Sequence, residues 1–316
     1  MTNRLADKVA VVTGSGRGLG RSMVLLLAKE GAKVVVNDLG AGADGMGVSK
    51  VADEVVAEIK NDGGTAVANY DSVATREGAE NVIKTAIDNF GKIDILVNNA
   101  GILRDRMIWN MTDEEWDGVI KTHLYGHFYC TRAAVIKMRE LIKAGKQKNG
   151  RIINFASHAG IEGSPGQPNY AAAKMGIVGF TYSCANALGR YGITCNAVTP
   201  LAQTRMTDTV PEDMLRQHAI RDLGIKEAET MPLDQVKKLT IGGTPDAIAP
   251  LICWLASDET SHITGQVFVI TEGRVGLFSH MEESKLAYKD GMFSVDEIWR
   301  IMPLITAGLK NPAAGH

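Results

Sequence analysis

Residues 8–20 read KVAVVTGSGRGLG, and this stretch predicts the fold of the chain. Lys8 to Val12 is a short, valine-rich run closed by Thr13-Gly14, which is typical of a parallel strand buried on both faces. Gly18 to Lys29 then has the pattern of a helix, which ends at Gly31. A strand, a glycine-rich turn and a helix in this order indicate the first unit of an α/β domain.

The same alternation of strands and helices continues along the chain. Between successive apolar runs lie amphipathic, charged patterns with the spacing of helices. The further runs with strand character lie at residues 33–37, 65–69, 93–97, 151–155, 194–198 and 266–270. We therefore expect a single doubly wound Rossmann domain with a mostly parallel, seven-stranded sheet.

The expected domain organisation is one Rossmann domain followed by a C-terminal extension. The domain should cover residues 1–272 and include a lid over the substrate at about 201–245. Residues 273–316 should pack on the same domain or on a neighbouring subunit. In the lid, Met206, Met214 and Met231 could either form an adaptable apolar wall for the substrate or pack within a small pair of helices.

Two capping boxes predict where helices begin. Thr112 precedes Glu115 by three residues, and a long helix should run from there through Cys130 to about Leu141. Ser294 and Glu297 have the same spacing and predict a terminal helix over residues 295–304.

Composition excludes several classes of function. The 316 residues carry a net charge of −2, so no basic surface for nucleic acid is expected. The four cysteines form no C-x-x-C pair, which argues against a metal site and for buried, reduced thiols. We expect no leader before the first strand, and no apolar run approaches the roughly 20 residues that span a bilayer. We expect a cytoplasmic protein without a membrane partner.

The glycine-rich turn has the composition of a dinucleotide-binding site. Glycines let the backbone turn tightly and approach a pyrophosphate closely, and the following helix presents unpaired N–H groups to the phosphates. The string alone is weak evidence, but between a strand and a helix it is fairly specific. The expected contacts are Gly14, Ser15, Arg17, Gly18, Leu19 and Gly20.

Polar residues at three further strand ends complete this prediction. Asp38 can accept hydrogen bonds from the adenosine ribose and would repel a 2′-phosphate, so it favours NAD over NADP, although Arg17 could pair with such a phosphate. A solvated loop acid is the alternative for Asp38. The other expected contacts are Asp71, Ser72, Asn99, Ala100 and Gly101.

Three residues have the chemistry of a hydroxyl–carbonyl interconversion. Tyr170 and Lys174 are four residues apart at the start of a predicted helix, so they share one face, and Ser157 follows the preceding strand. The pKa of a free tyrosine, about 10, is too high for a base at neutral pH, and a nearby ammonium lowers it. A serine hydroxyl can hold the substrate oxygen in line.

Residues 8–272 resemble the short-chain dehydrogenase/reductase family. The resemblance is carried by TGSGRGLG at 13–20, NNAG at 98–101, Ser157 and YAAAK at 170–174, in the family's order and spacing. It implies that Tyr170 is the acid/base, that Lys174 binds the nicotinamide ribose and that Ser157 orients the substrate. It also implies that Tyr170 and Lys174 touch the cofactor, and that the chain forms a homodimer or homotetramer.

Longer strings are similar to the (3R)-hydroxyacyl-CoA dehydrogenase part of peroxisomal multifunctional enzyme type 2. These strings are VVVNDLG at 34–40, AVANYDSV at 66–73 and NNAGILRDR at 98–106. The resemblance implies NAD-linked oxidation of a 3-hydroxyacyl-CoA in fatty-acid or steroid side-chain β-oxidation. Rival interpretations are a 17β-type hydroxysteroid dehydrogenase acting on free sterols, a 3-oxoacyl reductase, and a non-catalytic NAD-binding sensor.

The chain departs from the general family pattern at His123, where the family carries a catalytic asparagine. Imidazole can both donate and accept a proton, so His123 is a candidate for a proton relay. A buried, hydrogen-bonded histidine without a catalytic part is an equally good interpretation.

Overall fold

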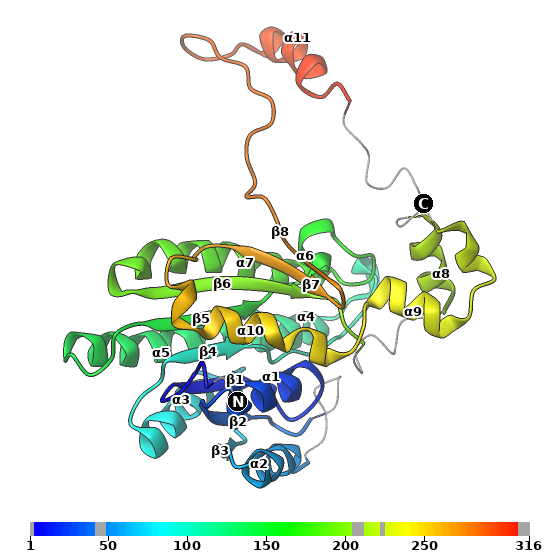
Figure 1. Ribbon diagram of the computed structural model, residues 1–316. Helices are drawn as coiled ribbons and strands as arrows, with labels where there is room; N and C mark the ends of the chain where they lie inside the picture. Colours follow the sequence, from blue (N-terminus) through cyan, green and yellow to red (C-terminus); the bar gives the residue numbers. More distant parts are fainter. Residues whose placement is uncertain (1–2, 42–48, 204–211, 222–224, 309–316) are drawn as a thin grey trace. The chain divides into compact units, whose positions relative to one another are not determined.

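The computed structural model describes residues 3–41, 49–203, 212–221 and 225–308 (Figure 1). It divides into two compact units, Met1–Phe278 and Ser279–His316, which are described separately. Residues 42–48, and Met206 of the predicted lid, lie outside the described residues.

The first unit is built on one eight-stranded sheet in the order β3-β2-β1-β4-β5-β6-β7-β8. All neighbouring strands up to β7 are parallel. The order reverses between β1 and β4, and in such sheets ligands bind beyond the carboxyl ends of the strands at that point. The strands are β1 (Val9–Thr13), β2 (Lys33–Asn37), β3 (Thr65–Asn69), β4 (Ile95–Asn98), β5 (Gly150–Phe155), β6 (Ile193–Pro200), β7 (Val267–Thr271) and β8 (Arg274–Leu277).

The doubly wound fold is confirmed, with one strand more than the seven predicted. Strand β8 returns antiparallel to β7 after a tight turn at Gly273, whose φ is +76°. Val275 and Leu277 of β8 are both more than half exposed. Because this edge strand lacks the buried apolar run that marks the inner strands, the sequence pattern did not reveal it.

Helices cover both faces of the sheet. Alternate residues of each inner strand point to opposite faces, so Ala10 and Val12 join one apolar core while Val9 and Val11 join the other. The first core is closed by α1, α2 and α10, and the second by α3, α5 and α7. The helices are α1 (Gly18–Lys29), α2 (Val51–Asn61), α3 (Arg76–Phe90), α4 (Asp113–Ile120), α5 (Gly126–Lys143), α6 (His158–Glu162), α7 (Pro168–Leu188), α8 (Glu212–Arg221), α9 (Leu233–Ile241), α10 (Ala249–Ala256) and α11 (Val295–Ile305).

The long helix predicted after Thr112 is interrupted. Its capping box is present, with Thr112 and Glu115 exchanging hydrogen bonds at the start of α4. Residues Lys121–Tyr125 then form a π-helical turn, η2, before α5 continues to Lys143. Such turns are rare and are often found at functional sites.

Part of the predicted lid is a small helical pair. Leu215 and Ala219 of α8 and Val236 of α9 form a separate apolar cluster, and Met231 packs against it. Of the two possibilities for Met231, packing within the helices is therefore the one observed. The side chain of Met214 lies outside the described part of the chain.

The second unit contains α11, which begins with the predicted capping box between Ser294 and Glu297. Its apolar side chains Val295 and Trp299 are largely exposed within this unit. The predicted packing of the extension on the domain or on a neighbouring subunit stays a prediction.

Within the described residues, no single helix is long and apolar enough to cross a membrane. One bent pair, Leu233–Ala247 with Ala249–Ala256, passes that test by length and composition together. The described part of the chain holds no group of three or more histidine, cysteine or acidic residues that could bind a metal ion. The four cysteines are free.

A buried amide network ties the centre of the sheet to two helices. The Asn98 side-chain amide donates to Asn154 Oδ1 and to Thr131 Oγ1, both at 2.9 Å, which joins β4 to β5 and α5. Asn154 Nδ2 donates in turn to Thr181 Oγ1 of α7 at 2.9 Å. Both asparagines are essentially inaccessible to solvent, so their amide N–H groups depend on these partners, whereas Asn98 Oδ1 is buried without one.

We expect Asn154→Leu to lower the free energy of unfolding by about 1–3 kcal/mol, because in a buried site it removes one of the two acceptors of the Asn98 amide and the donor to Thr181 Oγ1. Urea unfolding followed by circular dichroism measures this. The control is Asn89→Leu, whose exposed amide donates to a carbonyl within α3 and should change stability by less than about 0.5 kcal/mol. Equal losses in the two variants would show that the network contributes nothing specific.

Candidate active site

The turn between β1 and α1 requires glycine at several positions. Gly14 and Gly18 have φ values of +64° and +51°, in the region that L side chains avoid. A Cβ at Gly14 would lie 2.7 Å from Ala100 Cα, and one at Gly20 would lie 2.1 Å from the Gly14 carbonyl oxygen. The turn is therefore packed tightly against the chain on both sides.

The N-terminus of α1 fits an anionic ligand. No side chain caps this helix, and its first turn contains no acidic residue. Its first N–H groups and the positive end of its dipole are therefore available to phosphate oxygens. Together with the close-packed glycines, this supports binding of a dinucleotide pyrophosphate by the turn.

Asp38 is held firmly at the end of β2. Its carboxylate accepts hydrogen bonds from the backbone N–H groups of Gly16 and Gly40, each at 2.8 Å. The side chain of Arg17 is directed to Ser49, to which it donates at 2.9 Å. A fixed negative charge at this position favours a ribose with free hydroxyls over a phosphorylated one.

Ser15 differs from the other predicted contacts of the turn. It is fully buried, and its hydroxyl donates to the Val12 carbonyl at 2.8 Å. Its backbone N–H donates to the Asn37 carbonyl. Ser15 therefore supports the turn from inside and does not line the cleft.

The turn after β4 is fastened directly to the glycine turn. Thr13 Oγ1 accepts hydrogen bonds from the N–H groups of Asn99 and Ala100, at 3.0 and 3.1 Å. The Asn99 amide donates back to the carbonyls of Thr13 and Gly14. The two turns that should contact the cofactor are thus one hydrogen-bonded structure.

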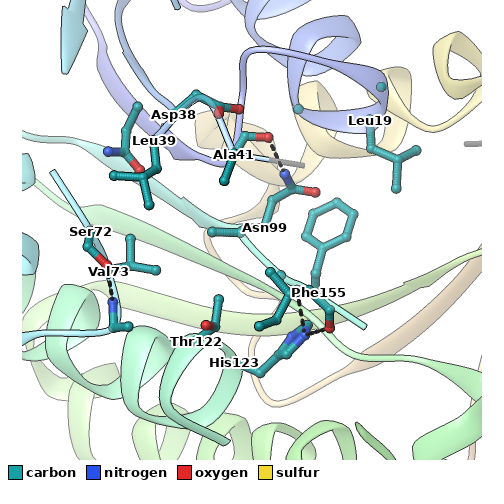
Figure 2. A pocket seen from close by; sticks show the side chains of 18 of the residues that line it. Leu19, Asp38, Leu39, Ala41, Ser72, Val73, Asn99, Thr122, His123 and Phe155 are labelled. Carbon is teal, nitrogen blue, oxygen red and sulfur yellow. Dashed lines mark hydrogen bonds between the residues drawn. The ribbon is translucent and has the colours of Figure 1, made fainter. Parts of the chain in front are cut away.

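The cleft above these turns has a volume of about 550 Å³. Figure 2 shows Asp38 and Leu39 at one end, Asn99 between, and His123 near Phe155 towards the other end. The structure places these predicted residues in its wall: Gly14, Arg17, Gly18, Leu19, Gly20, Asp38, Asp71, Ser72, Asn99, Ala100, Gly101, His123, Tyr170 and Lys174.

Sequence reasoning missed part of the wall. The missed residues include Asn37, Leu39, Val73, Ala74, Ile102, Arg104, Lys121, Thr122, Phe155, Ala156 and Pro200. Most of them flank strand ends that the sequence analysis identified, so chain position was the available signal. Lys121 and Thr122 belong to the π-helical turn and carried no such signal.

Tyr170 and Lys174 line one end of the cleft, and Ser157, which is not among the residues of its wall, contacts Tyr170. Tyr170 and Lys174 lie one helical turn apart near the start of α7, and Ser157 is the N-cap residue of α6. The Ser157 hydroxyl is hydrogen-bonded to Tyr170. Lys174 Nζ donates to the Phe155 carbonyl at 2.6 Å and lies 5.4 Å from the centre of the Tyr170 ring.

Burial dominates the electrostatics of this group. It lowers the pKa of Lys174 to about 7, since the charged form loses its hydration. Burial also raises the pKa of Tyr170 above its ordinary value of 10, while the hydrogen bond to Ser157 acts in the opposite direction. The pKa of Tyr170 is therefore raised, and not lowered by Lys174 as predicted, because burial and then the charge of Asp105 raise it and only the bond to Ser157 lowers it.

His123 lies in the wall of the cleft, packed against Gly101, where any Cβ would lie 2.2 Å from its ring. Its Nε2 accepts from the Ile102 N–H at 3.1 Å and lies 2.8 Å from the Ile102 carbonyl oxygen. Its Nδ1 is buried without a hydrogen-bond partner, and its ring meets that of Tyr170 edge-on at 5.1 Å. Burial and the Lys174 charge lower its pKa well below 6.5, so the ring is neutral. Its role as a relay stays a prediction.

Comparison with known proteins agrees with this geometry. A family model described as short chain dehydrogenase matches residues 8–215. The hydroxyacyl-CoA dehydrogenase ChsB1 of Mycobacterium tuberculosis is 42% identical over 319 residues, covering 100% of this chain and 91% of that protein. The peroxisomal multifunctional enzyme type 2 of Mus musculus is 43% identical over 274 residues, which cover 86% of this chain and 33% of that enzyme. A crystal structure of a short chain dehydrogenase from Mycobacterium avium superimposes with a TM-score of 0.80 and 38% identity, over 98% of each chain. These matches confirm the predicted resemblance.

We expect Lys174→Met to stabilise the cofactor-free protein most at low pH while abolishing turnover. Below about pH 7 the lysine is protonated in both the folded and the unfolded chain, so the cost of its buried charge is fully present. As the pH rises from about 7 to 10.5, the folded chain releases this proton and the unfolded chain keeps it, so the cost disappears.

Urea unfolding at pH 6 and pH 9 tests this sign. The gain in unfolding free energy over the parent chain should be larger at the lower pH. The control is Lys60→Met, an exposed lysine of α2, which should show no such pH dependence. A gain that is independent of pH would mean that Lys174 keeps an ordinary affinity for its proton.

Proposed function

The chain belongs to the short-chain dehydrogenase family, and on this premise we propose that it oxidises 3-hydroxyacyl-CoA thioesters to 3-oxoacyl-CoA with NAD. The family makes it an oxidoreductase acting on CH–OH groups. The observation that carries the proposal is that Tyr170, hydrogen-bonded to Ser157, and Lys174 line the same cleft as Asp38. The reaction would serve fatty-acid or steroid side-chain β-oxidation.

The chain's own residues account for the proton chemistry. Ser157 can hold the substrate oxygen beside Tyr170, whose phenolate accepts the hydroxyl proton. NAD, when bound, supplies the hydride acceptor and a positive charge that favours the phenolate. The Lys174 amino group is held by its hydrogen bond to the Phe155 carbonyl and provides a proton donor next to Tyr170.

Asp38 favours NAD over NADP. Its carboxylate is fixed by two backbone N–H groups, so it cannot swing away from a 2′-phosphate without breaking both bonds. Arg17 is hydrogen-bonded to Ser49 and would have to leave it to pair with such a phosphate. Both observations favour a cofactor whose adenosine ribose is not phosphorylated.

Similarity to a hydroxyacyl-CoA dehydrogenase favours a CoA thioester as the substrate. ChsB1, which the chain matches along its whole length, is named a hydroxyacyl-CoA dehydrogenase. The NNAGILRDR string spans the β4 turn and continues into the segment before α4, beside the catalytic group. A free hydroxysteroid is the rival substrate.

The proposed assembly is a cytoplasmic homodimer or homotetramer built through the surface of α4, η2 and α5. This surface exposes Trp116, Tyr125 and Phe128. Large exposed aromatic side chains grouped on a helical face are typical of a protein–protein interface.

We expect Asp38→Ala to shift cofactor preference towards NADP, because it removes the negative charge that repels a 2′-phosphate. The ratio of kcat/KM for NAD to that for NADP should fall at least about 100-fold, which corresponds to roughly 2.7 kcal/mol. The control is Asp71→Asn, which alters another carboxylate of the same cleft and should leave the ratio nearly unchanged. A parent enzyme that uses both cofactors equally would contradict the assignment.

Steady-state oxidation of 3-hydroxyacyl-CoA thioesters and free hydroxysteroids, followed at the nicotinamide absorbance, tests the substrate class. We expect kcat/KM to be at least about 100-fold higher for the thioesters. Tyr170→Phe should abolish turnover while NAD binding survives, because only the acid/base is lost. Preference for free steroids would assign the rival function. Absence of turnover together with NAD binding would indicate a sensor.

A further inference from the structure

An exposed apolar turn precedes α4. Met107, Ile108 and Trp109 are consecutive and have exposed fractions of 40%, 62% and 72%. The last two open the 3-10 turn η1 (Ile108–Asn110). A run of exposed apolar residues is unfavourable in water unless a ligand or partner covers it, and an indole is among the largest apolar surfaces a single residue can offer.

The turn is connected to the catalytic tyrosine through Asn169. Asn169 is fully buried, and its Oδ1 accepts the backbone N–H of Tyr170 at 2.7 Å. Its side-chain amide donates to the carbonyls of Arg104 and Glu115, each at 3.0 Å. One side chain therefore fixes Tyr170 and both ends of the segment that carries the turn.

Further contacts hold the turn in one conformation. The Arg106 N–H donates to the Gly166 carbonyl at 2.7 Å, across to the loop before α7. The Arg106 guanidinium pairs with Glu115 at 2.7 Å, and the Asn110 N–H closes η1 on the Met107 carbonyl. A ligand would thus meet a surface that needs no ordering, which removes part of the entropic cost of binding.

The segment that leads to the turn starts in the cleft wall and runs beside the loop before Tyr170. Arg104 lies in the cleft wall together with Tyr170, and only two residues separate Arg104 from Met107. Both of these intervening residues are charged and have partners: Asp105 accepts from the Gln167 amide at 2.8 Å, and Arg106 pairs with Glu115. A molecule that extends from the catalytic end of the cleft along this segment would reach the apolar side chains of the turn.

We propose that Met107, Ile108 and Trp109 form the docking surface for the apolar acyl chain of the substrate, beyond the carbon that is oxidised. This inference rests on the proposed function. It makes the enzyme selective for thioesters with long apolar acyl chains, since a short chain would end before it reaches the turn. The contribution belongs to substrate binding, so it should change KM and leave kcat nearly unchanged.

The test compares hydroxybutyryl-CoA with hydroxyhexadecanoyl-CoA in the parent enzyme and in Trp109→Ala. We expect the KM of the long thioester to rise about tenfold, the size of losing most of one buried aromatic contact. The KM of the short thioester and both kcat values should stay within about twofold. Ile108→Ser should act in the same direction, and Trp109→Phe should recover most of the loss.

Trp254→Ala is the matched control, because that indole is 40% exposed on α10, which closes the opposite face of the sheet. It should leave the chain-length dependence unchanged, and thermal unfolding confirms that all variants are folded. An unchanged KM for the long thioester in Trp109→Ala, or equal rises for both thioesters, overturns the inference. So does a change in oligomeric state, which would assign the turn to a contact between chains. If the parent enzyme oxidises neither thioester, the proposed function itself fails.

Discussion

The site depends on the reversal of strand order between β1 and β4, which brings two turns from distant parts of the sequence to the same edge of the sheet. Thr13 closes β1 and accepts the N–H groups of Asn99 and Ala100, so the turns behave as one rigid wall. Gly14 must have no side chain there, since a Cβ would meet Ala100. The glycine string is therefore required twice, once for approach to a pyrophosphate and once for contact between the turns.

Burial sets the chemistry at the other end of the cleft. Burial lowers the pKa of Lys174 to about 7 and raises that of Tyr170, so near neutral pH the lysine is only partly protonated and the tyrosine is neutral before a cofactor binds. His123 is also neutral for the same reason. Buried ionisable side chains of this kind contribute little to stability. Their protonation states change strongly when a positive charge enters the cleft. The buried amides of Asn98 and Asn154 support the strands beneath it.

Much of the fold and of the candidate site was predictable, because these features follow from short-range sequence patterns. Apolar runs, glycine positions and the i, i+4 spacing of Tyr170 and Lys174 predicted the sheet, the cofactor turn and the catalytic pair. What was missed depends on tertiary contacts. The π-helical turn that holds His123 has no known sequence pattern, β8 is an exposed edge strand, and the inward orientation of Ser15 follows from its bond to Val12. The sign of the Tyr170 pKa shift also required knowing how deeply the group is buried.

Asn169 shows how one buried side chain can link reaction and recognition. It precedes Tyr170 in sequence and accepts that residue's backbone N–H, while its amide holds Arg104 at the cleft wall and Glu115 at the start of α4. Because Asn169 itself is fully buried, moving any one element leaves one of its polar atoms unsatisfied. The positions of Tyr170 and of the apolar turn are therefore coupled by geometry. An asparagine is suited to this task, because its side chain both accepts and donates at once.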